Sequence, residues 1–503
     1  MFKKDTFTVF FLFVIAIFIF FHSIYLNTPL VNYEYTIFEA VKSLLNPNYT
    51  KGMEIYWSKQ ANPLGYSLAA ATSAYFFGIS YWSIRLPSVL GGVFILLAGF
   101  IYFHKKYYEK KMLLIIWVLM VSLNPLFWVY SGRAFSDVLA VAFLSWAFLF
   151  CYLSKDRYKL HLLGGLCFSF AILIKFNSVL LGLGFFSILF VDKNIRLNLD
   201  KKKILSALFY TILPALILSI YFYLIYYNFG ILFISETAQN HFDGKAKYFV
   251  DCFLMYISYL TMLLGFTSLI PIYYLSRIWT RKRFLTFLMI SFVFGFIFWK
   301  NITFFCLGEM GYGRLFESFL NIKALFLVRT GCLILSFFVF FEWIYRINYL
   351  KNKTALFMIS IILPYLLVAS LSKPVQRYLL FCLPFLTFYL IIILGSHIPK
   401  RIHFFAWPTI GIFAILSLIS AAYQIGVGQA SENIAKWLEK NNYLKDTYVG
   451  SLDPDATHYF LDNSERQKKY NVIISKIPPD NYLYKESVKI FGRTIRTHYV
   501  IKL

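Results

Sequence analysis

Charged residues are scarce in this chain, and acidic residues are the scarcest of them. Only 15% of the 503 residues are charged, and 24 acidic residues stand against 49 basic ones. A soluble globular protein typically has about a quarter of its residues charged and about half of them apolar. Here 59% are hydrophobic and 21% aromatic, which argues against a soluble enzyme and excludes disorder over most of the length.

Cysteine is also rare, and its placement shows no ligand pattern. The chain has six cysteines, none of them after Cys382, and it has no CxxC motif or Cys/His spacing typical of a metal site. We therefore expect neither a disulfide framework nor a structural zinc site. No internal repeat is apparent, which weighs against the inverted-repeat transporters.

Long apolar runs are the main feature that is present. A membrane-spanning helix needs about 20 mostly apolar residues. Such runs occupy residues 7–26, 83–103, 112–130, 135–153, 160–174, 178–191, 205–226, 251–275, 284–300, 326–346, 355–371, 378–395 and 403–423. We therefore expect an α-helical polytopic membrane protein with about 13 transmembrane helices, the first of them retained rather than cleaved as a signal peptide.

Basic residues cluster in the short loops between alternate apolar runs. Examples lie around Lys105, Lys155, Lys202, Arg281 and Lys351, and the formal net charge is +25. Clusters of this kind mark the cytoplasmic loops of membrane proteins. The pattern predicts a multi-pass protein of the plasma or inner membrane with a cytoplasmic N-terminus and, for an odd number of spans, an extracytoplasmic C-terminus. It also explains the charge without a nucleic-acid partner.

Two regions outside the apolar runs are long enough to have structure of their own. Residues 27–82 form a long first outer loop, whose stretches 35–45 and 64–78 suit helices at the membrane surface. Residues 424–503 begin with the amphipathic sequence SENIAKWLEKNN and continue with the β-like runs DTYVGSL, YNVIISKI and THYVIKL. We expect a transmembrane domain over 1–423 and a small α/β domain on the outer face over 424–503.

Ionisable residues near membrane depth are costly and mark candidate functional sites. Most of them lie on the predicted outer side: Glu34, Arg133, Asp137, Lys175, Glu236, His241, Lys373 and Arg377, with Tyr378 beside the last. Each has a simpler interpretation, because Arg133 and Asp137 could form a helix-end ion pair, the lysines could reach lipid headgroups, and His241 could be an ordinary loop residue. Together, carboxylates and cations on one face suggest acid/base chemistry on an anionic, lipid-linked substrate.

Several short motifs occur in an order that resembles one protein family. They are Tyr33-Glu34, Ala61-Asn62-Pro63-Leu64, Arg85-Leu86-Pro87-Ser88, Arg133 with Asp137, Lys175, the NHFDG sequence at 240–244, and Arg377-Tyr378-Leu379-Leu380 with Pro384. In order and spacing they resemble the membrane-embedded C-type glycosyltransferases of the protein O-mannosyltransferase and lipid A aminoarabinose transferase kind. The resemblance covers about residues 1–400.

The resemblance implies an inverting transfer of a sugar from a polyprenyl-phosphate donor to a lipid, glycan or protein acceptor, in contact with membrane lipids. A carboxylate would act as base, and the phosphate would be held by the cluster Arg133, Lys175, Lys373, Arg377 and Tyr378. The family's usual catalytic acid falls on Tyr33 here. We favour Glu34 as the base, with Asp137 organising the site and as the alternative base.

Other interpretations stay open at this stage. No cofactor is expected to be required, and Glu236 with His241 is the candidate site for a divalent metal ion. A transporter or flippase for a lipid-linked glycan would use the same cations without chemistry. A non-catalytic glycan-binding or assembly subunit is the third alternative, which the Tyr33 substitution leaves open.

Overall fold

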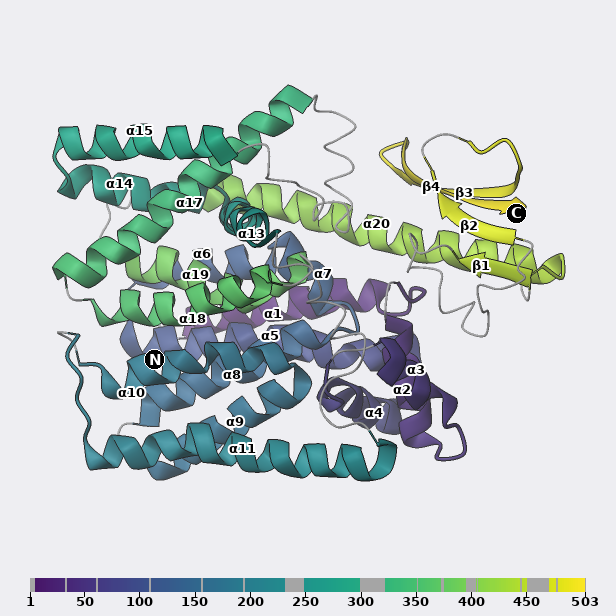
Figure 1. Cartoon of the computed structure of the whole chain (residues 1–503), viewed down its shortest axis with the longest axis horizontal. Coiled ribbons are helices and arrows are strands. Elements are labelled where there is room, and N and C mark those ends of the chain that lie inside the picture. The colour runs from purple at the N-terminus through teal and green to yellow at the C-terminus, as the bar shows by residue number, and fades with distance from the viewer. Residues whose placement is uncertain are drawn as a thin grey trace.

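The fold of the protein is taken from a computed structural model. The structure describes residues 5–31, 34–59, 62–107, 110–154, 157–192, 195–230, 248–298, 322–350, 352–371, 375–394, 404, 406–443, 446–449, 470–475 and 478–502. Most of these residues lie in helices that run side by side along the long axis of the molecule (Figure 1).

The helices of the bundle are bounded as follows: α1 (Asp5–Tyr25), α5 (Tyr81–Lys106), α6 (Lys111–Ser122), α7 (Pro125–Ser131), α8 (Ser136–Ser154), α9 (Tyr158–Ile174), η2 (Phe176–Gly182), α10 (Leu183–Phe190), α11 (Lys201–Phe229), α13 (Phe249–Leu264), η4 (Gly265–Ser268), α14 (Leu269–Ile278), α15 (Arg281–Phe298), α17 (Ile322–Leu350), α18 (Lys353–Ser370), η7 (Gln376–Phe381), α19 (Leu383–Phe388), η8 (Tyr389–Leu394) and α20 (Ala406–Lys440). The shorter helices α2 (Glu34–Leu45), α3 (Lys51–Lys59) and α4 (Gly65–Phe77) lie within the expected first outer loop.

Within the described residues, eight helical segments are long and apolar enough to cross a membrane, or nine if α6 and α7 form one bent span. The expected run 112–130 is not straight, because α6 and α7 meet at an angle of 61°. Asn124 causes the break: its side chain caps α7 by accepting from the Leu126 amide, and Pro125 occupies the first turn. The expected spans 160–174, 178–191 and 378–395 correspond to shorter helices. A polytopic helical membrane protein is confirmed, whereas the number 13 stays a prediction.

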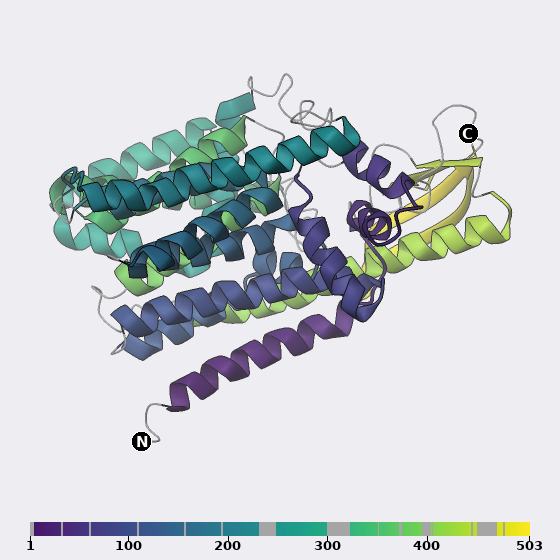
Figure 2. The ribbon, with the colours of Figure 1, turned by 90° about the horizontal axis from the view of Figure 1, so that it is seen from below.

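The expected surface helices and the C-terminal sheet lie at the same end of the bundle. Figures 1 and 2 show α2, α3 and α4 at the same end of the molecule as the sheet, and the first residues of α1 at the opposite end. Helix α4 ends on a row of exposed aromatic side chains, with Tyr75 and Phe76 each more than 70% exposed. Such a row suits a helix that rests on a lipid surface.

The C-terminal sheet has four strands in the order β1-β2-β4-β3. They are β1 (Thr447–Val449), β2 (Tyr470–Ile474), β3 (Tyr482–Ile490) and β4 (Arg493–Lys502). Strand β1 pairs with β2 in parallel, and the other pairs are antiparallel. The hairpin β3–β4 turns at Phe491-Gly492, which both have positive φ, as a two-residue hairpin turn requires.

Helix α20 joins the bundle to the sheet without a break. It runs through residues 423 and 424, where we expected one domain to end and the next to begin. Near its end, Ile434 and Leu438 form a small core with Val472 and Val500 of the sheet. The amphipathic sequence expected to begin the tail is therefore the last part of the final long helix.

Candidate active site

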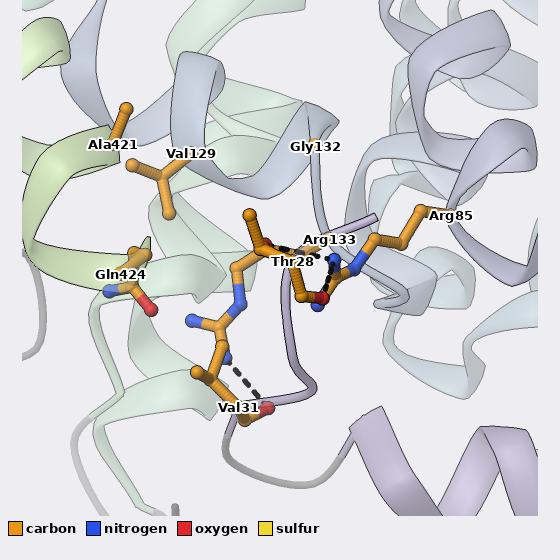
Figure 3. A pocket seen from close by; sticks show the side chains of 8 residues that line it. All are labelled: Thr28, Val31, Arg85, Val129, Gly132, Arg133, Ala421 and Gln424. Atoms are coloured by element: carbon orange, nitrogen blue, oxygen red, sulfur yellow. Dashed lines mark hydrogen bonds between the residues drawn. The ribbon is translucent and has the colours of Figure 1, made fainter. Parts of the chain in front are cut away.

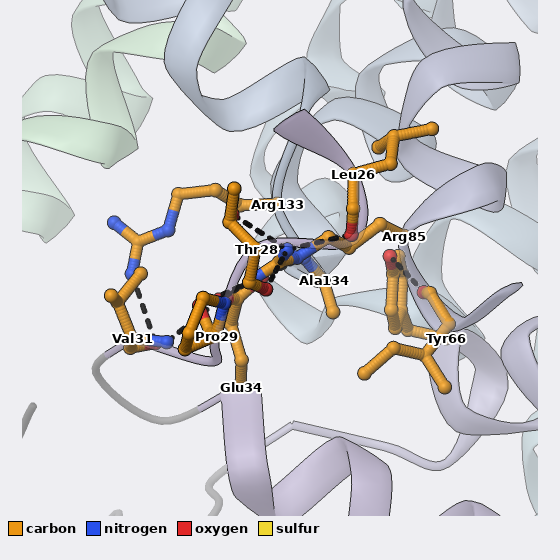
Figure 4. A network of polar contacts seen from close by, with 10 residues as sticks. Leu26, Thr28, Pro29, Val31, Glu34, Tyr66, Arg85, Arg133 and Ala134 are labelled. Carbon is orange, nitrogen blue, oxygen red and sulfur yellow. Dashed lines mark hydrogen bonds and ion pairs between the residues drawn. The ribbon is translucent and has the colours of Figure 1, made fainter. Parts of the chain in front are cut away.

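Glu34 and Arg85 form a buried ion pair at the end of the bundle that carries α2 to α4. Glu34 is the first residue of α2, and Arg85 lies in the second turn of α5. The Arg85 Nε donates to Glu34 Oε1 at 2.9 Å, and Nη2 donates to Oε2 at 2.7 Å, so the contact is bidentate (Figure 4). The same guanidinium also donates to the carbonyls of Leu26, Thr28 and Pro29.

Both oxygens of the Glu34 carboxylate accept two hydrogen bonds each. Besides the two bonds from Arg85, it accepts from the Ala134 amide at 2.7 Å and from the Val31 amide at 2.9 Å. Burial by itself would raise the pKa of Glu34, but the charges of Arg85 and Arg133 and these hydrogen bonds outweigh burial and hold the pKa below its usual range. Glu34 is therefore an ionised anchor that ties α2, α5 and the loop before α8 together.

Little room is left around this ion pair. A cavity of about 10 Å³ lies beside Arg85 and Arg133, with Gln424 and Ala421 of α20 on its other side (Figure 3). That volume is about the space for one water molecule. A sugar or a lipid phosphate does not fit in it, so the Glu34 network is closed in this structure.

Both polar residues of the Arg85-Leu86-Pro87-Ser88 motif form hydrogen bonds to other segments. Arg85 binds Glu34, and the Ser88 hydroxyl donates to the Phe135 carbonyl at 3.1 Å. Ser88 also contacts the Tyr66 hydroxyl of α4 at 2.8 Å. The motif therefore fixes the loop 132–135, which places Arg133 and Asp137.

Asp137 lies between two cations from distant parts of the chain. Its Oδ1 accepts a hydrogen bond from Lys175, and the Arg377 Nε lies 3.7 Å from Oδ2. Oδ2 accepts no hydrogen bond within the described part of the chain. Asp137 also lies in the first turn of α8, at the positive end of the helix dipole.

Aromatic rings hold the cations of the cluster in place. The guanidinium carbons of Arg133 and Arg377 both lie 4.7 Å from the centre of the Phe135 ring. The Lys175 ammonium lies 4.7 Å from the centre of the Tyr378 ring. Cation–π contacts of this kind stabilise charges that burial would otherwise disfavour.

Helix α13 fixes the segment that carries Arg377. The Val375 amide donates to the Tyr256 hydroxyl at 2.8 Å, and the Tyr259 hydroxyl donates to Gln376 Oε1 at 3.0 Å. The side chain of Arg377 is 22% exposed, whereas that of Lys175 is 3% exposed. Arg377 is therefore the more accessible of the two cations around Asp137.

The structure thus brings together six of the predicted site residues: Glu34, Arg133, Asp137, Lys175, Arg377 and Tyr378. The remaining three, Lys373, Glu236 and His241, lie outside the described residues, as does Tyr33. Among the described residues, no group of three or more His, Cys, Asp or Glu side chains could hold a metal ion. The metal site and the roles of the individual residues stay predictions.

Arg85 is the member of the cluster that sequence reasoning did not select. Its motif was noticed, but its role was not, although an arginine near the start of an apolar helix is itself a signal of a buried partner. With Arg85 included, the described cluster contains four cations and two carboxylates. It therefore carries an excess of two positive charges.

Residues 61–222 match the sequence model of the dolichyl-phosphate-mannose-protein mannosyltransferase family. The predicted family resemblance is confirmed. The matched segment contains Arg85, Arg133, Asp137 and Lys175, so most of the cluster lies in the part of the chain that resembles these mannosyltransferases.

Two solved structures are similar along nearly the whole chain. The crystal structure of ArnT from Cupriavidus metallidurans bound to undecaprenyl phosphate matches with a TM-score of 0.49 and 13% identity, covering 99% of this chain and 98% of that one. The structure of the same protein in the apo state matches with a TM-score of 0.47 and 13% identity, covering 98% of each chain. No curated protein sequence matches.

Proposed function

We propose that the protein is a membrane glycosyltransferase that moves a sugar from a polyprenyl-phosphate donor to a lipid, glycan or protein acceptor. The observation that carries the proposal is the cluster of four cations and two carboxylates at one end of the bundle, next to the surface helices. Its two excess positive charges match the charge of a phosphate monoester, which is the leaving group when a sugar departs from a polyprenyl-phosphate donor. The match to the mannosyltransferase family supports the same chemistry.

Arg377 and Lys175 are the cations that we assign to the donor phosphate. They flank Asp137, and Arg377 is partly exposed, so a lipid phosphate can approach it. In the reaction, the bond between the anomeric carbon and the phosphate oxygen breaks, and negative charge develops on that oxygen. Fixed cations beside this oxygen stabilise the transition state more than the ground state.

A base must take the proton of the acceptor hydroxyl as the new glycosidic bond forms. Glu34 and Asp137 are the two predicted candidates. All hydrogen-bonding positions of Glu34 are filled, whereas Asp137 Oδ2 accepts no hydrogen bond from the described residues. We therefore propose Asp137 as the base and Glu34 as the residue that positions the loop before α8. Attack by the acceptor opposite to the phosphate would invert the anomeric carbon.

The cluster also suggests where the reaction occurs. The basic loops predict that the opposite end of the bundle is cytoplasmic, so the cluster, the surface helices and the sheet would face the outer side. A lipid-linked donor that crosses the membrane before use would supply the sugar there.

The proposal is tested with purified protein, a polyprenyl-phosphate sugar donor and envelope acceptors. We expect donor-dependent glycosylation of an acceptor, and release of polyprenyl phosphate in equal amount. Asp137→Asn should lower turnover by about 10²–10⁴-fold, the usual contribution of a general base. Asp251→Asn in the first turn of α13 is a control that removes a carboxylate outside the cluster.

A carrier for lipid-linked glycans is the second candidate, because the bend between α6 and α7 is the kind of broken helix that carriers use. Movement of a labelled donor across a vesicle membrane, without release of polyprenyl phosphate, would favour the carrier. Such a result would contradict the transferase.

A further inference from the structure

A second cavity lies at the end of the bundle far from the candidate active site. It has a volume of about 840 Å³, which is in the range of ligand pockets. Lys106, at the end of α5, lines it, and Arg85 lies near the start of the same helix. At a rise of about 1.5 Å per residue, roughly 30 Å of helix separate the two, close to the thickness of the hydrocarbon core.

All the charged residues in the described lining are cationic. Lys106, Lys203 and Lys353 line the cavity, and none of its described lining residues is acidic. They come from the end of α5 and the starts of α11 and α18, so three separate helices converge there. The charges of Lys203 and Lys353 repel each other, and Asp192, the nearby carboxylate, does not line the cavity.

Two of the three cations are held at the cavity by neighbouring groups. Lys353 donates to the Ile188 carbonyl at 2.7 Å, and Lys106 donates to the Tyr102 hydroxyl at 3.2 Å. Lys106 also lies 5.4 Å from the centre of the ring of Tyr152, another residue of the lining. Lys106 and Lys353 are therefore positioned by specific contacts at the cavity.

Most of the remaining lining is apolar or aromatic, and the uncharged polar residues Ser145, Ser154, His161, Asn352 and Thr354 complete it. The aromatic part includes Phe148, Phe357, Phe385, Phe388 and Trp117. A cationic rim above an aromatic interior suits an amphiphile whose anionic group meets the lysines and whose hydrocarbon enters between the helices. A purely soluble anion would gain nothing from the apolar part.

We infer that this cavity binds the phosphate group of a membrane lipid, with Lys106, Lys203 and Lys353 around the anion and the aromatic residues around the start of its chains. The site is separate from the proposed transfer reaction and does not depend on it. Either an anionic phospholipid or polyprenyl phosphate supplies the same chemistry.

The test measures lipid binding to the full-length protein purified in neutral detergent. The probes are phosphatidylglycerol, polyprenyl phosphate, phosphatidylcholine and inorganic phosphate, each titrated separately. We expect phosphatidylglycerol or polyprenyl phosphate to bind more tightly than phosphatidylcholine. The triple variant Lys106→Gln/Lys203→Gln/Lys353→Gln should weaken that binding by roughly tenfold or more, because each cation near a lipid phosphate contributes separately.

A matched control removes three cations from the same end of the bundle but outside the cavity. Lys105, Lys201 and Lys202 are exposed and adjacent in sequence to two of the lining lysines, and they do not line the cavity. Lys105→Gln/Lys201→Gln/Lys202→Gln should bind the lipid within about twofold of the unchanged protein. If the cavity triple variant does not fold, the single variants Lys203→Gln and Lys353→Gln should each weaken binding by a few-fold.

Competition between the two lipids identifies the source of the phosphate, and tighter binding of either one supports the inference. Equal binding by the cavity and control variants would overturn it, and so would binding of phosphatidylcholine as tight as that of the anionic lipids. Binding of inorganic phosphate alone would show a soluble-anion site and would also overturn it.

Discussion

The variant Glu34→Gln tests whether Glu34 positions the neighbouring loop or acts as the catalytic base, because the two roles predict different losses of stability and turnover. The substitution keeps the size of the side chain but removes its charge and places an NH₂ group where one oxygen accepts from Arg85 and a backbone amide. Arg85 is 2% exposed, so it would stay buried opposite a neutral group. Breaking one partner of a buried ion pair costs about 3–5 kcal/mol. We expect Glu34→Gln to lower the melting temperature of the detergent-solubilised protein by several degrees.

The pH dependence of stability gives a second readout of the same ion pair. The pKa of Glu34 in the folded protein lies below its ordinary value of 4.5. The carboxylate therefore contributes stability that is present above about pH 4.5 and is lost as the pH falls toward its pKa in the folded state. The melting temperature of the unchanged protein should therefore fall as the pH is lowered below about 4.5, and that of Glu34→Gln should fall less over the same range.

Glu39 provides a matched control on the same helix. It is 7% exposed and pairs with Lys42, whose side chain is 37% exposed, so Glu39→Gln removes a carboxylate from a partly solvated pair. It should lower the melting temperature much less than Glu34→Gln. The reasoning is refuted if Glu34→Gln melts like the unchanged protein and yet loses turnover by about 10²-fold or more, because Glu34 would then be the base.

Three further outcomes can be measured directly. Arg377→Lys should weaken donor binding several-fold in a titration with polyprenyl-phosphate sugar, because a forked guanidinium becomes a point charge; unchanged affinity would make Arg377 an interfacial anchor. A reporter fused after Leu503 should be active outside the membrane and one inserted at Lys202 inside, and the reverse result would place the cluster on the cytoplasmic side. Turnover should persist in a chelator, because fixed cations can stabilise the phosphate leaving group; complete loss that added divalent metal restores would contradict this.

The helical membrane fold follows from hydropathy, but its breaks do not. An apolar run shows that a segment lies in a hydrophobic environment, not that it is straight. In the run 112–130, Asn124 and Pro125 end one helix and start another. Strand β3 was not expected at all, because Lys485, Glu486 and Lys489 hide its apolar alternation.

The positions of charged residues in the sequence predicted most members of the site, but they did not predict which residues form ion pairs with each other. Six polar residues on the predicted outer side lie in one cluster, because charged groups at membrane depth are costly unless they pair with one another. Which partner each selects depends on contacts between residues far apart in sequence, such as Glu34 with Arg85. Sequence patterns describe local periodicity and cannot specify such pairs.

Two glycines lie inside α20 just beyond residue 423, where we expected the last span to end. Gly426 and Gly428 resemble a helix end, but they lie inside α20. A Cβ at Gly426 would lie 2.8 Å from a methyl of Val488, and one at Gly428 would lie 3.0 Å from the Pro29 carbonyl oxygen. These positions need glycine for close packing against the sheet and the first loop, and not for a turn.

The unbroken course of α20 has a mechanical consequence. With 35 residues, the helix is roughly 50 Å long. The first part of α20 lies among the membrane helices, and its last turns pack against the sheet, so the helix transmits movement from one to the other. A tilt of about 10° at the start of the helix would move the far end by roughly 9 Å, with no hinge in between to absorb the motion. The sheet therefore follows the orientation of the last membrane helix. Gln424 lies in the same helix and lines the small cavity beside Arg133, so a tilt of α20 would also change the surroundings of the charged cluster.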